Sequence, residues 1–122
     1  MSVMDCYEIW FDLKDTSRDL EFVENVDRYL GSLKEQSLIA GWRLTRRKLG
    51  LGVAELGEFH ITIETADLAQ LERAFQRAAS RDEQIEPLHA AVYSMIRNGR
   101  FALYRDFPDA GRVRPRVGSD AL

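Results

Sequence analysis

Alternation of apolar and polar residues with a period of two marks four stretches of the chain as strands. The clearest is EFHITIE at residues 58–64, where Phe59, Ile61 and Ile63 alternate with charged and polar residues. This alternation is typical of a strand with one buried and one polar face. Three further stretches are rich in aromatic or β-branched residues, and we predict strands there too, at residues 6–13, 38–48 and 101–107.

Apolar residues spaced three and four apart predict helices between these strands. The first helix follows a cluster of capping residues at 14–17 and ends near residue 37. The second begins after Thr65 or Asp67 as its cap. A short break separates it from a third helical piece, which we expect to end at the left-handed stop Asn98-Gly99. The apolar positions that define these helices include Phe22, Val26, Leu33, Leu71, Phe75, Leu88 and Val92.

The order of these elements predicts an α+β domain with a ferredoxin-like β-α-β-β-α-β fold, whose second helix is in two pieces. In such a fold the helices cover one face of a four-stranded antiparallel sheet. The apolar residues of all four predicted strands can face the helices together. We place the domain at residues 1–108 and expect residues 109–122, which have no hydrophobic pattern, to form a flexible tail.

Composition narrows the classes of partner. The formal net charge is −3, and the tail holds three arginines, so the domain itself is mildly acidic and has no general attraction for phosphate backbones. No apolar run approaches the roughly 18 residues of a membrane span. Cys6 is the only cysteine, so an intramolecular disulfide is excluded. We expect a cytoplasmic protein that binds neither nucleic acid nor membrane.

The face of the predicted sheet that points away from the helices is unusual. Besides acidic and arginine side chains it holds a histidine and two large aromatic residues, Trp10 and Tyr104. A face left in water would expose both aromatic rings. The same face could instead pair with its own copy across a two-fold axis, where opposite charges meet reciprocally. A third alternative is that it binds nucleic acid or another protein.

The strings CYEIWFDL, GWRLTRRKLGLG, EFHITIE and FALYRDFP resemble an uncharacterised bacterial family of dimeric ferredoxin-like proteins, within the dimeric α/β-barrel superfamily. The resemblance covers about residues 6–108 and implies a homodimer in which two sheets stack face to face. The superfamily includes cofactor-independent monooxygenases, haem-degrading enzymes and proteins without assigned activity. Their ligands lie between the sheet and its covering elements or inside the barrel. The matching strings are framework segments, so no catalytic residue is carried over.

His60 is the best single candidate for chemistry, because it lies mid-strand on the polar face with Glu8, Trp10 and Arg43 as neighbours. It could act as a general base whose ring is oriented by a carboxylate. The alternative is a hydrogen-bonded histidine in a dimer interface, since structural networks contain such histidines as well. If a ligand pocket lies near His60, the residues expected to bind the ligand are Glu8, Trp10, Trp42, Arg43 and Tyr104.

Other candidates have simpler explanations. His89 lies beside the apolar stripe of the third helical piece, where a structural role at the helix–sheet boundary is expected. No HxxE, HxH or CxxC spacing is present, so we expect neither metal nor cofactor. Cys6 has no activating neighbour. The third strand lacks the aromatic pattern of RNA-recognition motifs. The glycine-containing segment at 49–57 carries four apolar residues, which we expect to pack on a partner subunit or to cover a pocket.

Two functions from different classes remain open. The first is a homodimeric protein for a small organic molecule, either a binder or a cofactor-free enzyme. The second is a non-catalytic dimerisation or protein-interaction domain. The histidine, tryptophan and tyrosine on one face favour the first, whereas the absence of any catalytic motif favours the second.

Overall fold

The computed structural model describes residues 3–80, 82–112 and 114–115. It has four strands and three α-helices in the predicted order, and the α+β ferredoxin-like prediction is confirmed, including the division of the second helix into two pieces. The elements are β1 (Asp5–Leu13), α1 (Asp19–Glu35), β2 (Gly41–Arg46), β3 (Phe59–Thr65), α2 (Leu68–Ala79), α3 (Glu86–Tyr93) and β4 (Ile96–Arg105), with two short 3-10 turns, η1 (Thr16–Arg18) and η2 (Ala110–Arg112).

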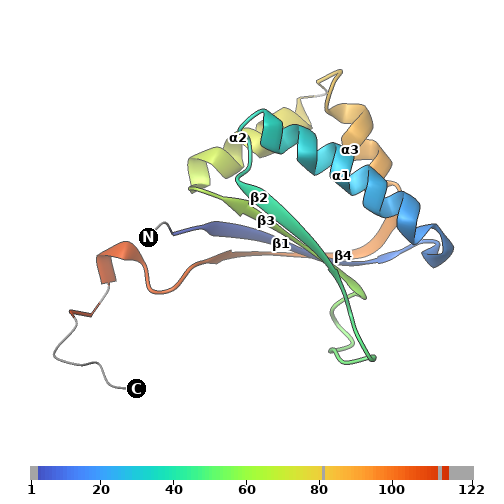
Figure 1. Cartoon of the computed structure of the whole chain (residues 1–122), viewed down its shortest axis with the longest axis horizontal. Coiled ribbons are helices and arrows are strands. Elements are labelled where there is room, and N and C mark those ends of the chain that lie inside the picture. Colours follow the sequence, from blue (N-terminus) through green and yellow to red (C-terminus); the bar gives the residue numbers. More distant parts are fainter. Residues whose placement is uncertain (1–2, 81, 113, 116–122) are drawn as a thin grey trace.

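The four strands form one antiparallel sheet in the order β2-β3-β1-β4. All three α-helices lie on the same side of this sheet, and none of the α-helices in the described part of the chain covers the opposite face (Figure 1). We call the two sides the helix side and the open face. Because β1 and β3 are the central strands, side chains at the middle of the open face come from these two strands.

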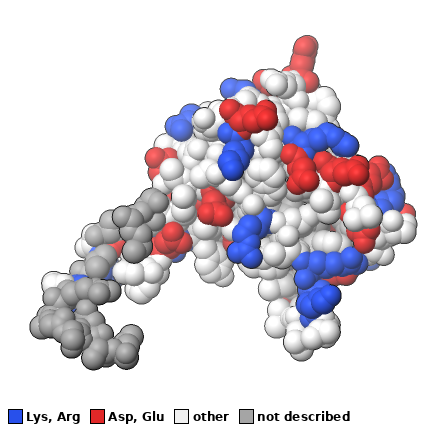
Figure 2. All heavy atoms as spheres, in the orientation of Figure 1, with Lys and Arg blue, Asp and Glu red and all other residues white. Residues whose placement is uncertain are grey.

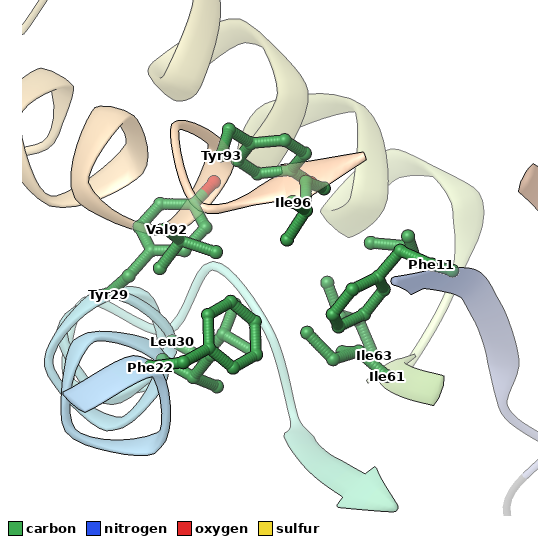
Figure 3. A pocket seen from close by; sticks show the side chains of 11 residues that line it. Phe11, Phe22, Tyr29, Leu30, Ile61, Ile63, Val92, Tyr93 and Ile96 are labelled. Carbon is green, nitrogen blue, oxygen red and sulfur yellow. The ribbon is translucent and has the colours of Figure 1, made fainter. Parts of the chain in front are cut away.

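The core fills the space between the helices and the helix side of the sheet. The predicted alternation places these side chains correctly, since Phe11 of β1 and Phe22 of α1 are completely buried. Figure 3 shows Phe22, Tyr29 and Leu30 pointing from α1 towards strand residues such as Ile61, with Val92 of α3 beside them. The core also includes Leu38 and Ile39, which lie between α1 and β2. These two residues were predicted to belong to a strand at 38–48, but β2 spans only Gly41–Arg46.

Asp67, rather than Thr65, caps the second helix. Its side chain accepts a hydrogen bond from the Gln70 amide at 2.8 Å, which satisfies one of the unpaired amides of the first turn. Thr65 is instead buried in β3, where its hydroxyl donates to the carbonyl oxygen of Asp5.

The strand predicted at residues 101–107 begins earlier than expected, and the helical piece predicted to end at Asn98-Gly99 is correspondingly shorter. Helix α3 ends at Tyr93, and β4 already begins at Ile96. Asn98 does have a left-handed backbone, with φ of 57°, but this conformation lies inside β4, where the pairing with β1 shifts register between Trp10 and Asp12. Asparagine tolerates such a conformation in a bulge as well as at a helix end. Of the predicted flexible tail, residue 113 and residues 116–122 lie outside the described residues.

The connection between β2 and β3 projects beyond the end of the sheet on the side away from the helices (Figure 1). The Arg47 guanidinium donates to the carbonyl oxygens of Val53, Leu56 and Gly57 and so holds this connection in shape. Leu49 and Leu51 are highly exposed within it. Figure 2 shows its end as a largely uncharged protrusion. That these apolar residues contact a partner or cover a pocket stays a prediction.

Candidate functional site

Strand pairing brings together the side chains that the sequence singled out on the open face. In the register of β1 with β3, Trp10 lies opposite His60 and Glu8 lies opposite Thr62. Directly opposed residues in an antiparallel pair project from the same face, and all four point away from the helices. We refer to Glu8, Trp10, His60 and Thr62 as the open-face cluster.

The open-face cluster is held by specific contacts. The Nε2 atom of His60 lies 3.0 Å from Oε1 of Glu8, and the Thr62 hydroxyl donates to the same oxygen at 3.0 Å. The indole of Trp10 stacks on the imidazole, with ring centroids 4.5 Å apart and planes 7° apart. A carboxylate oxygen accepts hydrogen bonds, so Nε2 of His60 carries the proton and, in the neutral ring, Nδ1 is left as an acceptor. Chemically, this is an oriented imidazole with a lone pair available for a proton.

The second oxygen of Glu8 is less well satisfied. Its Oε2 atom is buried and has no hydrogen-bond partner within the described part of the chain. A buried carboxylate oxygen without a donor costs about 1–3 kcal/mol or more relative to a paired one. The open-face cluster therefore lacks a donor at one position.

The other predicted ligand-binding residues are divided between the two sides of the sheet. Arg43, opposite Thr62 on β2, and Tyr104, opposite Cys6 on β4, share the open face and are both exposed. Trp42 lies on the helix side, where it packs against the core and lines a groove between α1 and β2. The structure therefore brings Glu8, Trp10 and His60 into contact, but it separates Trp42 from them.

Cys6 lies on the open face at the start of β1. Burial, followed by the negative charge of Glu8 and other nearby carboxylates, raises the pKa of its thiol. A protonated thiol is a poor nucleophile, so Cys6 is not set up for covalent chemistry.

A second region lies on the helix side and holds a cavity of about 290 Å³ that is open to solvent at one side, where Phe75 and Phe101 are each about half exposed. Helices α1, α2 and α3 line it on one side, and β1, β3 and β4 line it on the other. Three aromatic rings interlock at its wall: Tyr7 meets Phe75 edge-on at 5.0 Å and stacks with Phe101 at 6.0 Å. The lining residues are Tyr7, Tyr29, Leu33, Ile39, Ile63, Leu71, Ala74, Phe75, Ala78, His89, Tyr93 and Phe101. We call this space the helix-side cavity.

His89 is the one imidazole in the lining of the helix-side cavity. Its ring stacks on Tyr93 at 4.3 Å and meets Tyr29 edge-on at 5.4 Å. Burial lowers the pKa of His89, against a smaller opposing effect of Glu86, so the ring is neutral at pH 7. Burial also raises the pKa of Tyr29 to about 12 and that of Tyr93 further still. The cavity thus presents aromatic walls, an uncharged imidazole and protonated phenols.

The sequence patterns placed His89 at the helix–sheet boundary in a structural role and did not identify the residues of this cavity, although the family resemblance implied ligands between the sheet and its covering elements. The available signal was the spacing of four residues that puts both rings on one face of α3. Nothing local to the sequence shows that Tyr29 of α1 and Phe75 of α2 reach the same space, because that depends on how three helices pack on the sheet.

The described residues were searched for metal-binding groups and for membrane-spanning helices. Within them, no group of three or more histidine, cysteine, aspartate or glutamate residues is arranged to hold a metal ion. Among the helices described, none combines the length and apolar character that crossing a membrane requires.

Solved structures with this fold come from several bacteria. SnoaB from Streptomyces nogalater, a cofactor-independent oxygenase, is 12% identical with a TM-score of 0.64, over 92% of this chain and 100% of SnoaB. A dimeric ferredoxin-like protein of unknown function from Thermobifida fusca is also 12% identical, with a TM-score of 0.58 over 85% of this chain and 92% of that one. A Dabb family protein from Mesorhizobium loti is 14% identical, with a TM-score of 0.58 over 89% of this chain and 100% of that one.

At these identities the likeness shows the fold alone. Comparison with the curated proteins finds no match. A family model described as "Family of unknown function (DUF6614)" matches residues 4–117.

Proposed function

We propose that this chain, which belongs to the DUF6614 family of unknown function, is a homodimer that binds a small, uncharged and largely aromatic molecule in the helix-side cavity. The observation that carries this proposal is the cavity itself. At about 290 Å³ it is many times the roughly 10–15 Å³ that one water molecule needs. Apolar walls with a few polar groups are typical of sites for small organic ligands.

The lining also supports the chemical class of the ligand. No aspartate, glutamate, lysine or arginine lines the helix-side cavity, so a charged ligand would lose its hydration without gaining an ion pair. Stacked rings such as those of Tyr7 and Phe101 favour a flat aromatic ligand. The neutral His89 ring can donate or accept one hydrogen bond, which suits a ligand hydroxyl or carbonyl group.

A homodimer is supported by the open face and by the fold. The open face combines the partly exposed Trp10 with charges of both signs, and no α-helix of the described residues covers it. Large aromatic side chains that are partly exposed are typical of an interface. Proteins with this fold include several described as dimeric ferredoxin-like proteins. We expect the homodimer to work in the cytoplasm and without a cofactor.

A second candidate function is acid–base catalysis at the open-face cluster, with His60 as the base. The specific observation is the 3.0 Å contact between His60 and Glu8, which fixes the tautomer and leaves Nδ1 free to accept a proton. The competing interpretation is a structural role, in which the same contacts stabilise a dimer interface.

The two candidates are separated by a thermal-shift screen of neutral mono- and bicyclic aromatic compounds, with 1-naphthol as the first probe. The screen compares the wild type with two variants of α2. Ala78→Leu narrows the helix-side cavity. Ala79→Leu is the matched control, because it adds the same side chain to the exposed side of the helix. We expect shifts for the wild type and Ala79→Leu that are lost in Ala78→Leu.

Shifts that persist in Ala78→Leu, or a complete absence of shifts in the wild type, would contradict binding in the helix-side cavity. Shifts that disappear in His60→Ala but persist in Ala78→Leu would favour the second candidate. Failure of every compound, together with an intact dimer, would favour the alternative of a non-catalytic interaction domain.

A further inference from the structure

Three tyrosine hydroxyl groups belong to the helix-side cavity. Tyr7 comes from β1, Tyr29 from α1 and Tyr93 from α3, and all three residues line the cavity. In the part of the chain that the structure describes, no hydrogen bond involves any of these hydroxyl groups. Their oxygen atoms are not sealed inside the protein, since Oε2 of Glu8 is the only completely buried side-chain oxygen or nitrogen without a partner among the described residues. Water or a ligand therefore completes them. We refer to these three tyrosines as the tyrosine cluster.

The hydroxyl groups of the tyrosine cluster are protonated and lie near one another. Burial raises the pKa of all three residues, that of Tyr29 to about 12. A negative charge on Tyr7 contributes to the raised pKa of the other two, which requires the phenol oxygens to be close together. At neutral pH each hydroxyl group keeps its proton and is a hydrogen-bond donor. Three structural elements thus bring three O–H donors to one region of the cavity.

The tyrosine cluster reaches the inner end of the cavity, whereas the mouth is apolar. Tyr29 and Tyr93 also line a small space inside the core, where Figure 3 shows Tyr29 of α1 reaching towards Tyr93 of α3. Phe75 and Phe101 are each about half exposed and mark the mouth. The ring of Tyr7 packs against both of these phenylalanines and so connects the mouth to the inner end. A bound molecule therefore meets donors inside and hydrocarbon outside.

The polar groups of the cavity are unbalanced towards donors. Besides the tyrosine cluster, the only polar side chain among the described residues of the lining is His89. Its neutral imidazole has one N–H donor and one acceptor nitrogen. Phenol oxygens accept hydrogen bonds only weakly, because they share a lone pair with the ring. The cavity consequently offers several good donors and a single good acceptor, and it favours a ligand that supplies an acceptor.

We propose that the tyrosine cluster binds an acceptor oxygen of the ligand, which makes the cavity selective for aromatic molecules that carry one, as in the carbonyl group of a ketone or lactone. The oxygen points to the inner end, and the hydrocarbon part contacts Phe75 and Phe101 at the mouth. Tyr29 and Tyr93 are then specificity-determining residues. This inference rests on the ligand site of the proposed function and adds the chemical group that the site recognises.

Selectivity arises because a ligand displaces the water molecules that the hydroxyl groups bind without it. A carbonyl oxygen has two lone pairs and can accept from two of the three hydroxyl groups. A hydrocarbon of the same shape leaves these donors without a partner, which costs binding free energy. Sites built to hydrogen-bond a ligand reject the analogue that lacks the matching group for this reason.

A matched pair of ligands tests the inference. 1-Indanone and indane have nearly the same shape and differ in one carbonyl group. Titration calorimetry would give the Kd of each for the wild type and for the double variant Tyr29→Phe with Tyr93→Phe, which removes two oxygen atoms and keeps both rings. The Kd of indane divided by that of 1-indanone should fall roughly tenfold in the double variant, because each neutral hydrogen bond changes an affinity roughly twofold to tenfold.

Two controls separate hydrogen bonding from a change of packing. Tyr104→Phe removes a phenol hydroxyl group on the open face, outside the cavity, and should leave the ratio unchanged. A hydrogen bond lowers the stretching frequency of a carbonyl group, so the infrared band of bound 1-indanone should lie lower in the wild type than in the double variant. If circular dichroism shows that the double variant does not fold, Tyr93→Phe alone replaces it, with a fall in the ratio of roughly twofold to tenfold.

The outcomes distinguish the inference from the proposal on which it rests. A wild type that binds neither compound would overturn both. Binding of both compounds with the same ratio of Kd values in the wild type and the double variant would overturn only the role of the tyrosine cluster, whose hydroxyl groups would then bind water alone. An unchanged carbonyl band, or an equal fall of the ratio in Tyr104→Phe, would lead to the same conclusion.

Discussion

The helix-side cavity makes a quantitative prediction for a single substitution in α2. Ala78 lines the cavity and is only partly exposed, whereas the next residue, Ala79, lies on the outer surface of the same helix. Replacing Ala78 with leucine adds three carbon atoms on the cavity side, and the space of about 290 Å³ accommodates them without displacing main chain.

The size of the effect follows from the area removed from water. Burying three carbon atoms completely would contribute about 2.4 kcal/mol at roughly 0.8 kcal/mol each, which is an upper bound because the cavity is open at one side. The loss of leucine rotamers offsets about 0.5–1 kcal/mol of this. We therefore expect Ala78→Leu to stabilise the ligand-free protein by about 1–2 kcal/mol. For a chain of this length such a gain raises Tm by roughly 3–8 °C.

The assay is urea unfolding followed by circular dichroism, with calorimetry for Tm. Ala79→Leu is the matched control, since it changes the same residue type in the same turn of α2 and should alter stability by no more than about 0.5 kcal/mol. Destabilisation of Ala78→Leu by more than about 1 kcal/mol would mean that the added carbons are overpacked. That result would refute the cavity as an open space for a ligand.

Three further predictions follow from contacts outside the cavity. The pKa of Asp12 is lowered, chiefly by a hydrogen bond from a main-chain amide, so its stabilising effect is present at neutral pH and is lost as pH falls through that lowered value. Urea unfolding between about pH 5 and 3 should show a steeper loss of stability for the wild type than for Asp12→Asn. Arg47→Ala removes the donor to three carbonyl oxygens and should speed chymotrypsin cleavage at the leucines of the β2–β3 connection, and equal cleavage rates would contradict this role. A Cβ added at Gly57 would overlap the main chain of Phe11, so Gly57→Ala should cost about 2 kcal/mol or more, and unchanged stability would rule the close approach out.

The fold was predictable because local and long-range signals agree. The two-residue alternation of β1 and β3 correctly assigned Phe11, Phe59 and Ile61 to the core and His60 to the open face. Where local signals are ambiguous, the prediction failed: Asn98-Gly99 suits a helix end as well as a bulge, and only its pairing with β1 decides between them.

The candidate site was predictable only in part. The placement of His60 and Glu8 on one face follows from strand alternation, which is a local pattern. Their contact also depends on the register of β1 against β3, which pairs segments far apart in the sequence and is not specified locally. Trp42 belongs to the opposite side of β2, as its own alternation with Arg43 indicates, so it could not share a pocket with His60 across the sheet. The helix-side cavity required the packing of three helices, which no local pattern specifies.

The open face as the interface of a homodimer is the central claim, and solution mass tests it most directly. Light scattering coupled to size exclusion would be applied to the wild type, to Trp10→Glu on the open face, and to Leu20→Glu, which changes an exposed apolar residue of α1 on the helix side. We predict a dimer for the wild type and for Leu20→Glu, and a monomer for Trp10→Glu. A monomeric wild type, or a dimer that Trp10→Glu leaves intact, would contradict the claim.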